Sequence, residues 1–80
     1  MMWNHRIIRQ PAPDGGYMFS LVEMFYGEND APWGWAFAEP AKLETVDEVA
    51  WMVERMRDAF TMSTVDVDES GRIIGTSSDG

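Results

Sequence analysis

The sequence contains no cysteine and only one histidine among its 80 residues. The absence of cysteine excludes a disulfide framework and thiolate metal sites, and it fits a reducing compartment. Long apolar runs are also absent. The first ten residues lack the apolar core of a signal peptide, and no run approaches the roughly 20 apolar residues that a membrane span needs. We therefore expect a soluble protein of the cytoplasm.

Basic residues are scarce, with six lysines and arginines against fourteen aspartates and glutamates, and the net charge is -8 at pH 7. A negative field of this strength repels nucleic acid and membrane surfaces and attracts basic protein surfaces. We therefore expect a protein partner, with no direct binding of nucleic acid or membrane. The alternative is that the charge serves only solubility.

Catalytic and metal-binding patterns are also missing. His5 is the sole candidate for a general base near neutral pH, and no serine or cysteine nucleophile motif accompanies it. The densest carboxylate cluster, Asp66, Asp68 and Glu69, does not have the spacing of a calcium loop. The glycines of segment 14–16 precede an expected strand, whereas a phosphate loop leads into a helix. We expect no enzyme, no metal and no cofactor.

The hydrophobic content of 45%, with four tryptophans and seven methionines, is typical of a folded chain. The length fits one small domain, which hides only a little over half of its unfolded surface when it folds alone. We assign residues 1–75 to this domain. Residues 76–80, which contain no large apolar side chain, are expected to form a flexible tail.

Several segments have the pattern of strands. Residues 3–10 and 17–26 flank a turn that contains Asp14-Gly15-Gly16, which predicts a hairpin. Large and small residues then alternate in a third strand over 33–38. A short C-terminal hairpin is expected from residues 62–67 and 72–74.

A helix is expected from Thr45 to Phe60. Thr45 and Glu48 have the spacing of a capping box, in which the threonine hydroxyl accepts from the Glu48 amide and the glutamate reaches back to the Thr45 amide. Apolar residues recur every three or four positions and should pack on the sheet: Val46, Val49, Val53, Met56 and Phe60. The predicted fold is α+β, an antiparallel sheet of three to five strands with one helix on one face, in the order β-β-β-α-β.

The strand at 17–26 is apolar on both faces, and one helix covers only one of them. The other face predicts a homodimer, because a monomer would leave that surface exposed to water. The expected dimer interface comprises Met18, Val22, Met24 and Tyr26. The alternative is that the C-terminal segment and the loops cover this face of the same chain.

Trp51 falls nearly opposite the apolar stripe on a helical wheel. Tryptophan is a frequent centre of binding energy, and nearby carboxylates can pair with a partner's arginine or lysine. The candidate partner-binding residues are Trp51, Asp47, Glu54, Asp58, and, in the loop after the second strand, Glu28 and Asp30. Trp51 has two other readings, a dimer contact or a ring stacked over Arg55 as a cation–π pair. Carboxylates spread over a rigid surface can also imitate a DNA phosphate backbone.

Three segments carry a resemblance. The opening Trp3-Asn4-His5-Arg6-Ile7-Ile8-Arg9, the strand at 17–26 and the helix at 44–60 resemble small bacterial and prophage proteins that begin W-N-x-R-I-I-R. The resemblance implies a shared fold. Typical members carry tyrosine where His5 stands here, which argues against a role for this histidine.

The chain also resembles phage anti-CRISPR proteins, which are often shorter than 100 residues, acidic and without enzyme motifs. It looks most like inhibitors of type I surveillance complexes, type I-C among them. This resemblance implies stoichiometric binding to basic Cas subunits, so that target DNA cannot enter. The alternative function is that of a small acidic accessory module of bacterial or prophage origin, which binds a protein but has no role in CRISPR inhibition.

Overall fold

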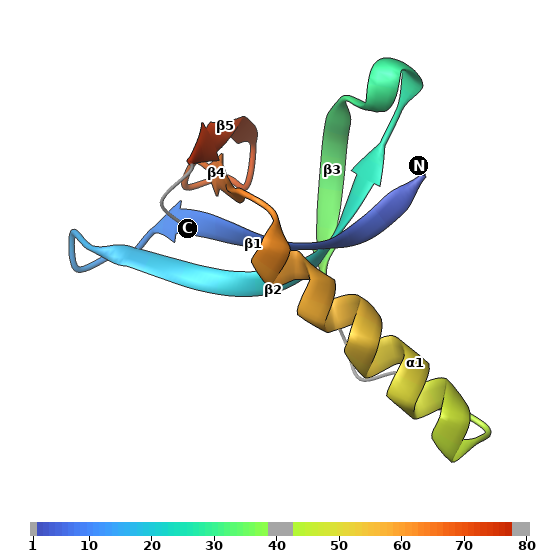
Figure 1. Cartoon of the computed structure of the whole chain (residues 1–80). Helices are drawn as coiled ribbons and strands as arrows, with labels where there is room; N and C mark the ends of the chain where they lie inside the picture. Colours follow the sequence, from blue (N-terminus) through green and yellow to red (C-terminus); the bar gives the residue numbers. More distant parts are fainter. Residues whose placement is uncertain (1, 39–42, 78–80) are drawn as a thin grey trace.

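A computed structural model describes residues 2–38 and 43–77 of the chain. Five strands, one α-helix and two short 3-10 helices follow one another in these residues (Figure 1). The elements are β1 (Trp3–Pro11), β2 (Tyr17–Tyr26), η1 (Glu28–Asp30), β3 (Pro32–Phe37), α1 (Val46–Arg57), η2 (Asp58–Thr61), β4 (Thr64–Val67) and β5 (Ile73–Ser77).

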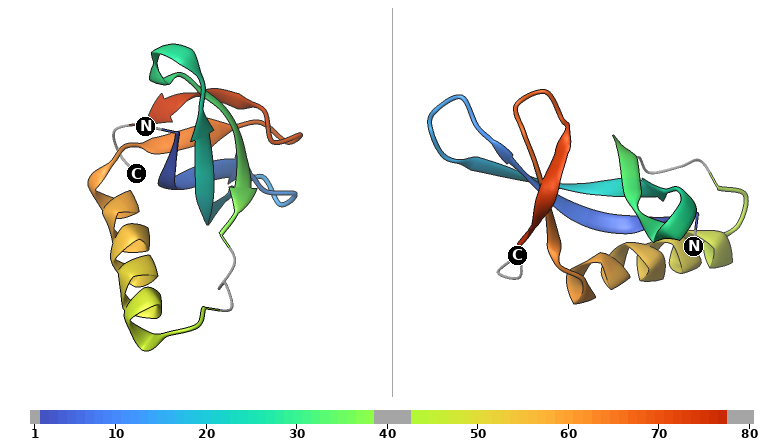
Figure 2. Two further views of the ribbon diagram at one scale, coloured as in Figure 1. Left: turned by 90° about the vertical axis from the view of Figure 1, so that its right-hand side faces the viewer. Right: turned by 90° about the horizontal axis from the view of Figure 1, so that it is seen from above.

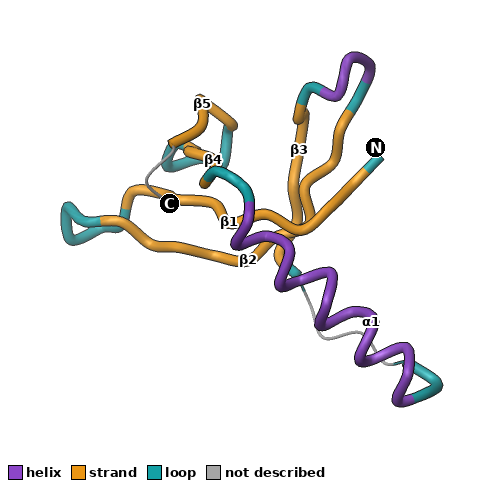
Figure 3. Tube along the Cα trace, viewed as in Figure 1, coloured by secondary structure: helices purple, strands orange, loops and turns teal. Residues whose placement is uncertain are grey.

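The five strands form one sheet in the order β3-β2-β1-β4-β5 (Figure 3). This arrangement confirms the α+β class. The expectation of an antiparallel sheet holds for three of the four neighbouring pairs, and it is wrong for β1 and β4, which run parallel. The reason is the connection through α1, because a long crossover brings the chain back to the sheet in the same direction, as a tight hairpin cannot.

The expected β1–β2 hairpin is present, and its register runs from Trp3 opposite Phe25 to Pro11 opposite Tyr17. Its turn is closed by the Asp14 carboxylate, which accepts from the Gly16 amide at 2.9 Å. Gly15 has φ +93°, a conformation that glycine adopts without cost. The local turn chemistry therefore fixes the pairing of the two longest strands.

The core lies on one face of this sheet. Ile8, Val22, Met24, Val65 and Val67 are buried there, and three larger side chains pack against them: Tyr26, Trp35 and Ile73. The sheet is strongly twisted, so that its two edges approach each other over this core (Figure 2). A hydrogen bond joins them, in which the Trp35 indole Nε1–H donates to the Gly71 carbonyl at 2.8 Å. The sheet thus covers its own core.

This core corrects the predicted dimer interface. Val22 and Met24 are fully buried within the single chain, so they offer no surface to a second copy. The Tyr26 hydroxyl is bonded to Asn4 and Arg6 of the same chain. Only Met18, near the hairpin tip, is exposed. The interface expected at these four residues is therefore wrong, and the face is covered largely by the chain's own C-terminal strands, which was the alternative.

The start of α1 is the predicted one. The Thr45 hydroxyl accepts from the Glu48 amide at 3.1 Å. The second half of the cap differs, because the same hydroxyl donates to the Glu48 carboxylate at 3.2 Å. The helix ends at Arg57 and continues as the 3-10 turn η2 to Thr61.

The position of α1 differs from the prediction. The helix lies to one side of the sheet, and its N-terminal end projects beyond the strands (Figures 1 and 2). Contact with the sheet is made near the other end, where Ala59 is buried and Arg55 lies over the Trp3 ring. The apolar stripe was expected to pack on the sheet, but four of its members are exposed: Val46, Val49, Val53 and Phe60. The core is enclosed by the strands themselves, so the stripe is not needed to cover it.

The C-terminal boundary is also corrected. Thr76 and Ser77 belong to β5 and pair with Val65 and Thr64. The flexible tail expected over 76–80 is therefore wrong for its first two residues, and residues 78–80 lie outside the described part of the chain.

The closure of the sheet predicts the effect of a substitution at Gly71. Gly71→Ala should lower the free energy of unfolding by about 2 kcal/mol, because φ is +90° and an added Cβ lies 3.2 Å from the Trp35 ring. Gly15→Ala is the matched control, since φ is +93° and no atom lies within 4 Å of its Cβ. Its loss should be about 1 kcal/mol, from backbone conformation alone. Urea denaturation followed by tryptophan fluorescence measures both, and equal losses would contradict tight packing of Trp35 on Gly71.

Candidate functional site

The candidate site is a line of side chains along α1 and into η2. Asp47, Trp51, Glu54 and Asp58 follow one another at spacings of four, three and four residues, which places them on one face of a helix. All four are exposed. The structure therefore brings together the helical residues that the sequence singled out. The Trp51 side chain retains 54% of its surface, which leaves a broad ring face available to a partner.

Arg55 holds Trp51 in place. The guanidinium carbon lies 5.0 Å from the centre of the Trp51 ring and 4.7 Å from the centre of the Trp3 ring. The cation–π alternative considered for Trp51 is thus present, and the three side chains form a stack from β1 to the outer face of the helix. Such contacts are worth about 0.5 to 2 kcal/mol each. Because the ring is half-exposed and already ordered, a partner that binds it loses less side-chain entropy.

The carboxylates of this face are weakly compensated. Glu54 has a long ion pair of 3.8 Å with Arg57, and both side chains are more than two-thirds exposed, so the pair contributes little to stability. Within residues 2–38 and 43–77, Asp47 and Asp58 have no salt bridge. The face therefore combines an ordered aromatic ring with negative charge that remains available to an outside cation.

Glu28 and Asp30 lie elsewhere. They belong to η1, at the outer end of the β2–β3 hairpin, far from α1 in two views of the molecule (Figures 1 and 2). Asn29 and Asp30 have φ of 64° and 55°, a left-handed conformation that asparagine and aspartate tolerate better than most residues. The acidic residues predicted for partner binding therefore form two separate patches, one along α1 and η2 and the other on η1.

His5 is buried, with 2% of its surface exposed, and its Nδ1 has no hydrogen-bond partner in the described residues. It lies edge-on to Trp3, with 5.5 Å between the ring centres. Burial lowers the pKa of the imidazole, the charge of Glu23 opposes this effect, and the charge of Arg55 adds to it. The ring is a buried packing group, and the absence of a catalytic role for His5 stays a prediction.

Two of the three carboxylates of segment 66–69, those of Asp66 and Asp68, have structural partners. Asp66 Oδ1 accepts from Arg9 Nε at 2.7 Å. Asp68 Oδ1 accepts from the Ser70 hydroxyl and from the amides of Ser70 and Arg72, at 2.7 to 2.9 Å, and these bonds lower its pKa. Asp68 thus closes the β4–β5 turn. In the part of the chain that the structure describes, no group of three acidic or histidine side chains could hold a metal ion.

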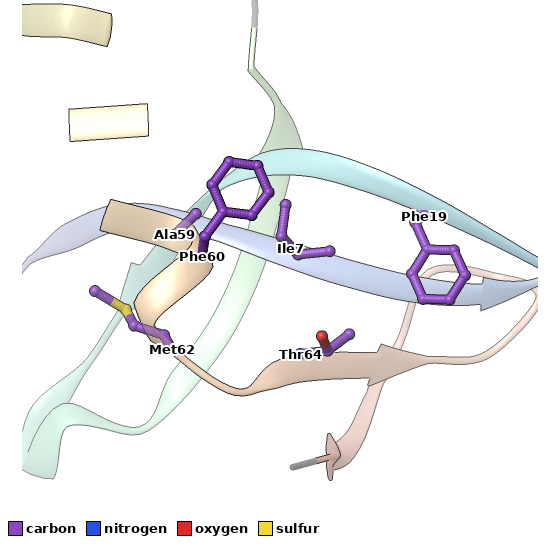
Figure 4. A pocket seen from close by; sticks show the side chains of 6 residues that line it. All are labelled: Ile7, Phe19, Ala59, Phe60, Met62 and Thr64. Carbon is purple, nitrogen blue, oxygen red and sulfur yellow. The ribbon is translucent and has the colours of Figure 1, made fainter. Parts of the chain in front are cut away.

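One feature was missed from the sequence. An open pocket of about 370 Å³ lies between β1, β2, β4 and η2 (Figure 4). Its lining is almost wholly apolar: Ile7, Phe19, Ala59, Phe60, Met62 and Thr64. The pocket exists because η2 meets the outer face of the sheet at an angle, which no periodicity of the sequence encodes. The exposed Phe60 connects it to the apolar side of α1.

No family model, curated protein or solved structure matches this chain. Among the described residues, no helix has both the length and the apolar character to cross a membrane.

The burial of His5 predicts a pH dependence of stability. Because the folded-state pKa lies below the value of 6.5 for an exposed histidine, the unfolded chain takes up the proton first as the pH falls. The free energy of unfolding should therefore decrease below about pH 6.5, until the folded-state pKa is passed. His5→Phe, which keeps a ring against Trp3, should remove this part of the decrease. Urea denaturation of both proteins at about pH 7.5 and about pH 5 measures it, with carboxylate effects common to both. Parallel pH profiles would rule out this role of His5.

Proposed function

We propose that this protein acts by binding the basic surface of a protein partner, through the face of α1 formed by Asp47, Trp51, Glu54 and Asp58. The observation that supports the proposal is the half-exposed Trp51 ring, ordered over Arg55 and flanked by carboxylates. A central aromatic ring surrounded by charged groups is the usual composition of an interface with high affinity. Such a face serves recognition and needs no cofactor or catalytic group.

The net charge of -8 determines that the preferred partner surface is basic. Over a protein of this size the negative field accelerates association with a basic partner and disfavours acidic ones. A surface built to receive DNA is lined with lysine and arginine, and it would accept rigid carboxylates in place of phosphates. The Glu28 and Asp30 patch on η1 is a second point of contact that such an extended groove could reach.

The partner that the resemblance to anti-CRISPR proteins favours is a type I surveillance complex in the cytoplasm of a host bacterium. In this reading the protein occupies a basic surface of a Cas subunit as a DNA mimic and blocks target DNA. The second candidate is a small acidic accessory protein of bacterial or prophage origin that binds a different partner. It is favoured by acidic residues that lie away from the Trp51 face, such as the exposed Glu69, because charge that serves only solubility is spread over the whole surface.

The first test is co-purification with a type I surveillance complex, followed by a gel-shift assay with target DNA on the complex that retains the protein. Retention together with loss of DNA binding is the expected result. Retention without loss of DNA binding would favour the accessory protein, and so would no retention across several subtypes.

The Trp51 face makes a graded prediction for whichever partner is found. Trp51→Ala should weaken binding at least tenfold, which corresponds to about 1.4 kcal/mol. Asp47→Lys combined with Asp58→Lys should weaken it further, and affinity should fall as NaCl rises from about 50 to about 500 mM. Isothermal titration calorimetry measures these affinities.

The matched control is Glu69→Lys, which makes the same charge change as either single lysine variant but lies on the β4–β5 turn. It should alter affinity by less than about threefold, through the long-range field alone. An equal loss for Glu69→Lys and Asp47→Lys would mean that net charge, and not the Trp51 face, governs binding. All these side chains are exposed, so the far-ultraviolet circular dichroism should stay unchanged.

A further inference from the structure

The side of α1 opposite Trp51 is an apolar surface without a partner among the described residues, 2–38 and 43–77. It consists of Val46, Val49, Val53 and Phe60, which are exposed by 83, 47, 51 and 75%. Monomeric proteins rarely leave a contiguous apolar patch of more than a few hundred square ångströms in water. Four large side chains along one helix reach that size, and we call them the valine stripe.

The rotation of α1 about its own axis explains why the valine stripe is free. The residues that meet the sheet are Met52, Arg55, Met56 and Ala59, all at least half-buried. At 100° per residue the centre of the stripe lies about 90° around the helix from the centre of this contact face. Only Met56 lies close to both faces. The contact with Trp3 through Arg55 fixes this rotation, and the stripe is left at the side of the contact face.

We propose that the valine stripe is a dimer interface, in which α1 of one copy packs antiparallel against α1 of a second copy around a two-fold axis near Val53. A two-fold axis makes the same surface serve both copies, so an apolar stripe is its own complement. The sector of α1 that carries the stripe holds a single charged residue, Arg57 at its edge. This helix surface is thus one that two acidic chains can bring together without burying carboxylates.

Charge complementarity supports the antiparallel direction. The first turn of α1 carries Asp47 and Glu48, and the last turn carries Arg55 and Arg57. Arg55 is held between Trp3 and Trp51, so Arg57 is the cation available to a second copy. Antiparallel packing brings the Arg57 end of each helix to the acidic end of the other, and it also opposes the two helix dipoles. Parallel packing would place like charges together.

The size of the interface sets the expected affinity. A helix of 12 residues is roughly 18 Å long, so two such faces reach at most the low end of protein interfaces, about 1,200 Å² in total. The apolar pocket joins the stripe at Phe60 and extends the apolar surface toward Phe19. We therefore expect a reversible dimer with a dissociation constant in the micromolar range, on the order of 10 μM.

The dependence on salt separates this interface from the proposed function. Each copy carries a charge of -8, so the two copies repel each other at a distance while their apolar faces attract. Raising NaCl from about 50 to about 500 mM should therefore strengthen the dimer severalfold, because screening reduces the repulsion. Binding of a basic partner has the opposite dependence. The dimer does not rest on the proposed function, and either can fail without the other.

Sedimentation velocity over a range of concentrations tests the dimer. The double substitution Val49→Gln and Val53→Gln leaves the charge and the helix propensity nearly unchanged and should weaken dimerisation at least tenfold. Trp51→Ala, on the opposite side of the same helix, is the control and should leave the dimer intact. The basic partner should show the reverse pattern, with loss for Trp51→Ala and none for the glutamine variant.

A cross-linking experiment tests the two-fold axis, because the chain has no cysteine of its own. Val53→Cys should form a disulfide-linked dimer under mild oxidation, since residue 53 of one copy lies near residue 53 of the other. Glu54→Cys, which is one residue away and points away from the stripe, should form much less disulfide-linked dimer under the same conditions.

Three results would overturn the proposal. The first is a single monomeric species at every concentration up to about 200 μM, well above the expected dissociation constant. The second is a dimer that the glutamine variant leaves unchanged or that cross-links equally through residues 53 and 54. The third is a large loss of stability of the glutamine variant at submicromolar concentration, because the stripe would then be packed within one chain.

Discussion

The hydrogen bond from the Trp35 indole to the Gly71 carbonyl is the contact on which the remaining architecture depends. It ties β3, at one edge of the sheet, to the turn before β5, at the other edge. With the edges joined, Ile8, Val22 and Val65 are enclosed by strands alone. The helix is then not needed as a cover, and it is attached to the sheet mainly at its C-terminal end. Both sides of α1 become available for other molecules.

In a protein of 80 residues, a helix rarely has so little contact with the rest of the chain. Small domains bury a modest share of their surface, and each exposed apolar residue reduces what folding gains. Here the two long sides of α1 have different chemistry: one combines Trp51 with carboxylates, and the other is formed by the valine stripe. Their opposite dependence on salt allows one helix to serve two associations that are centred on different side chains.

Local features of this fold could be predicted from the sequence because they are encoded by neighbouring residues. The Asp14-Gly15-Gly16 turn fixes the first hairpin, and the Thr45 cap fixes the start of the helix. The aromatic and β-branched residues of segment 17–26 predict the strand, but they do not tell which face is buried, since both faces are apolar. For the helix, the spacing of the apolar residues identifies a stripe. Which part of the chain packs against this stripe depends on the twist of the sheet. The parallel pairing of Ile8 with Val65 and the stack of Arg55 between two tryptophans arise only in three dimensions.

For the site, the helical wheel predicted that Trp51 lies among Asp47, Glu54 and Asp58. It could not predict that Glu28 and Asp30 lie far from Trp51, because a wheel describes one helix only.

The placement of β4 beside β1 also has a consequence for how the chain acquires its structure. The first three strands pair with their neighbours in sequence, whereas Arg9 meets Asp66, a residue 57 positions further along. Contacts across such a separation form late and slow the folding reaction. During synthesis on the ribosome the first three strands therefore emerge before Val65 and Val67. The apolar side of the β1–β2 hairpin stays exposed to water until β4 and β5 have left the exit tunnel. The folded state therefore requires β4 and β5, and a truncation before β4 leaves a hairpin prone to aggregation.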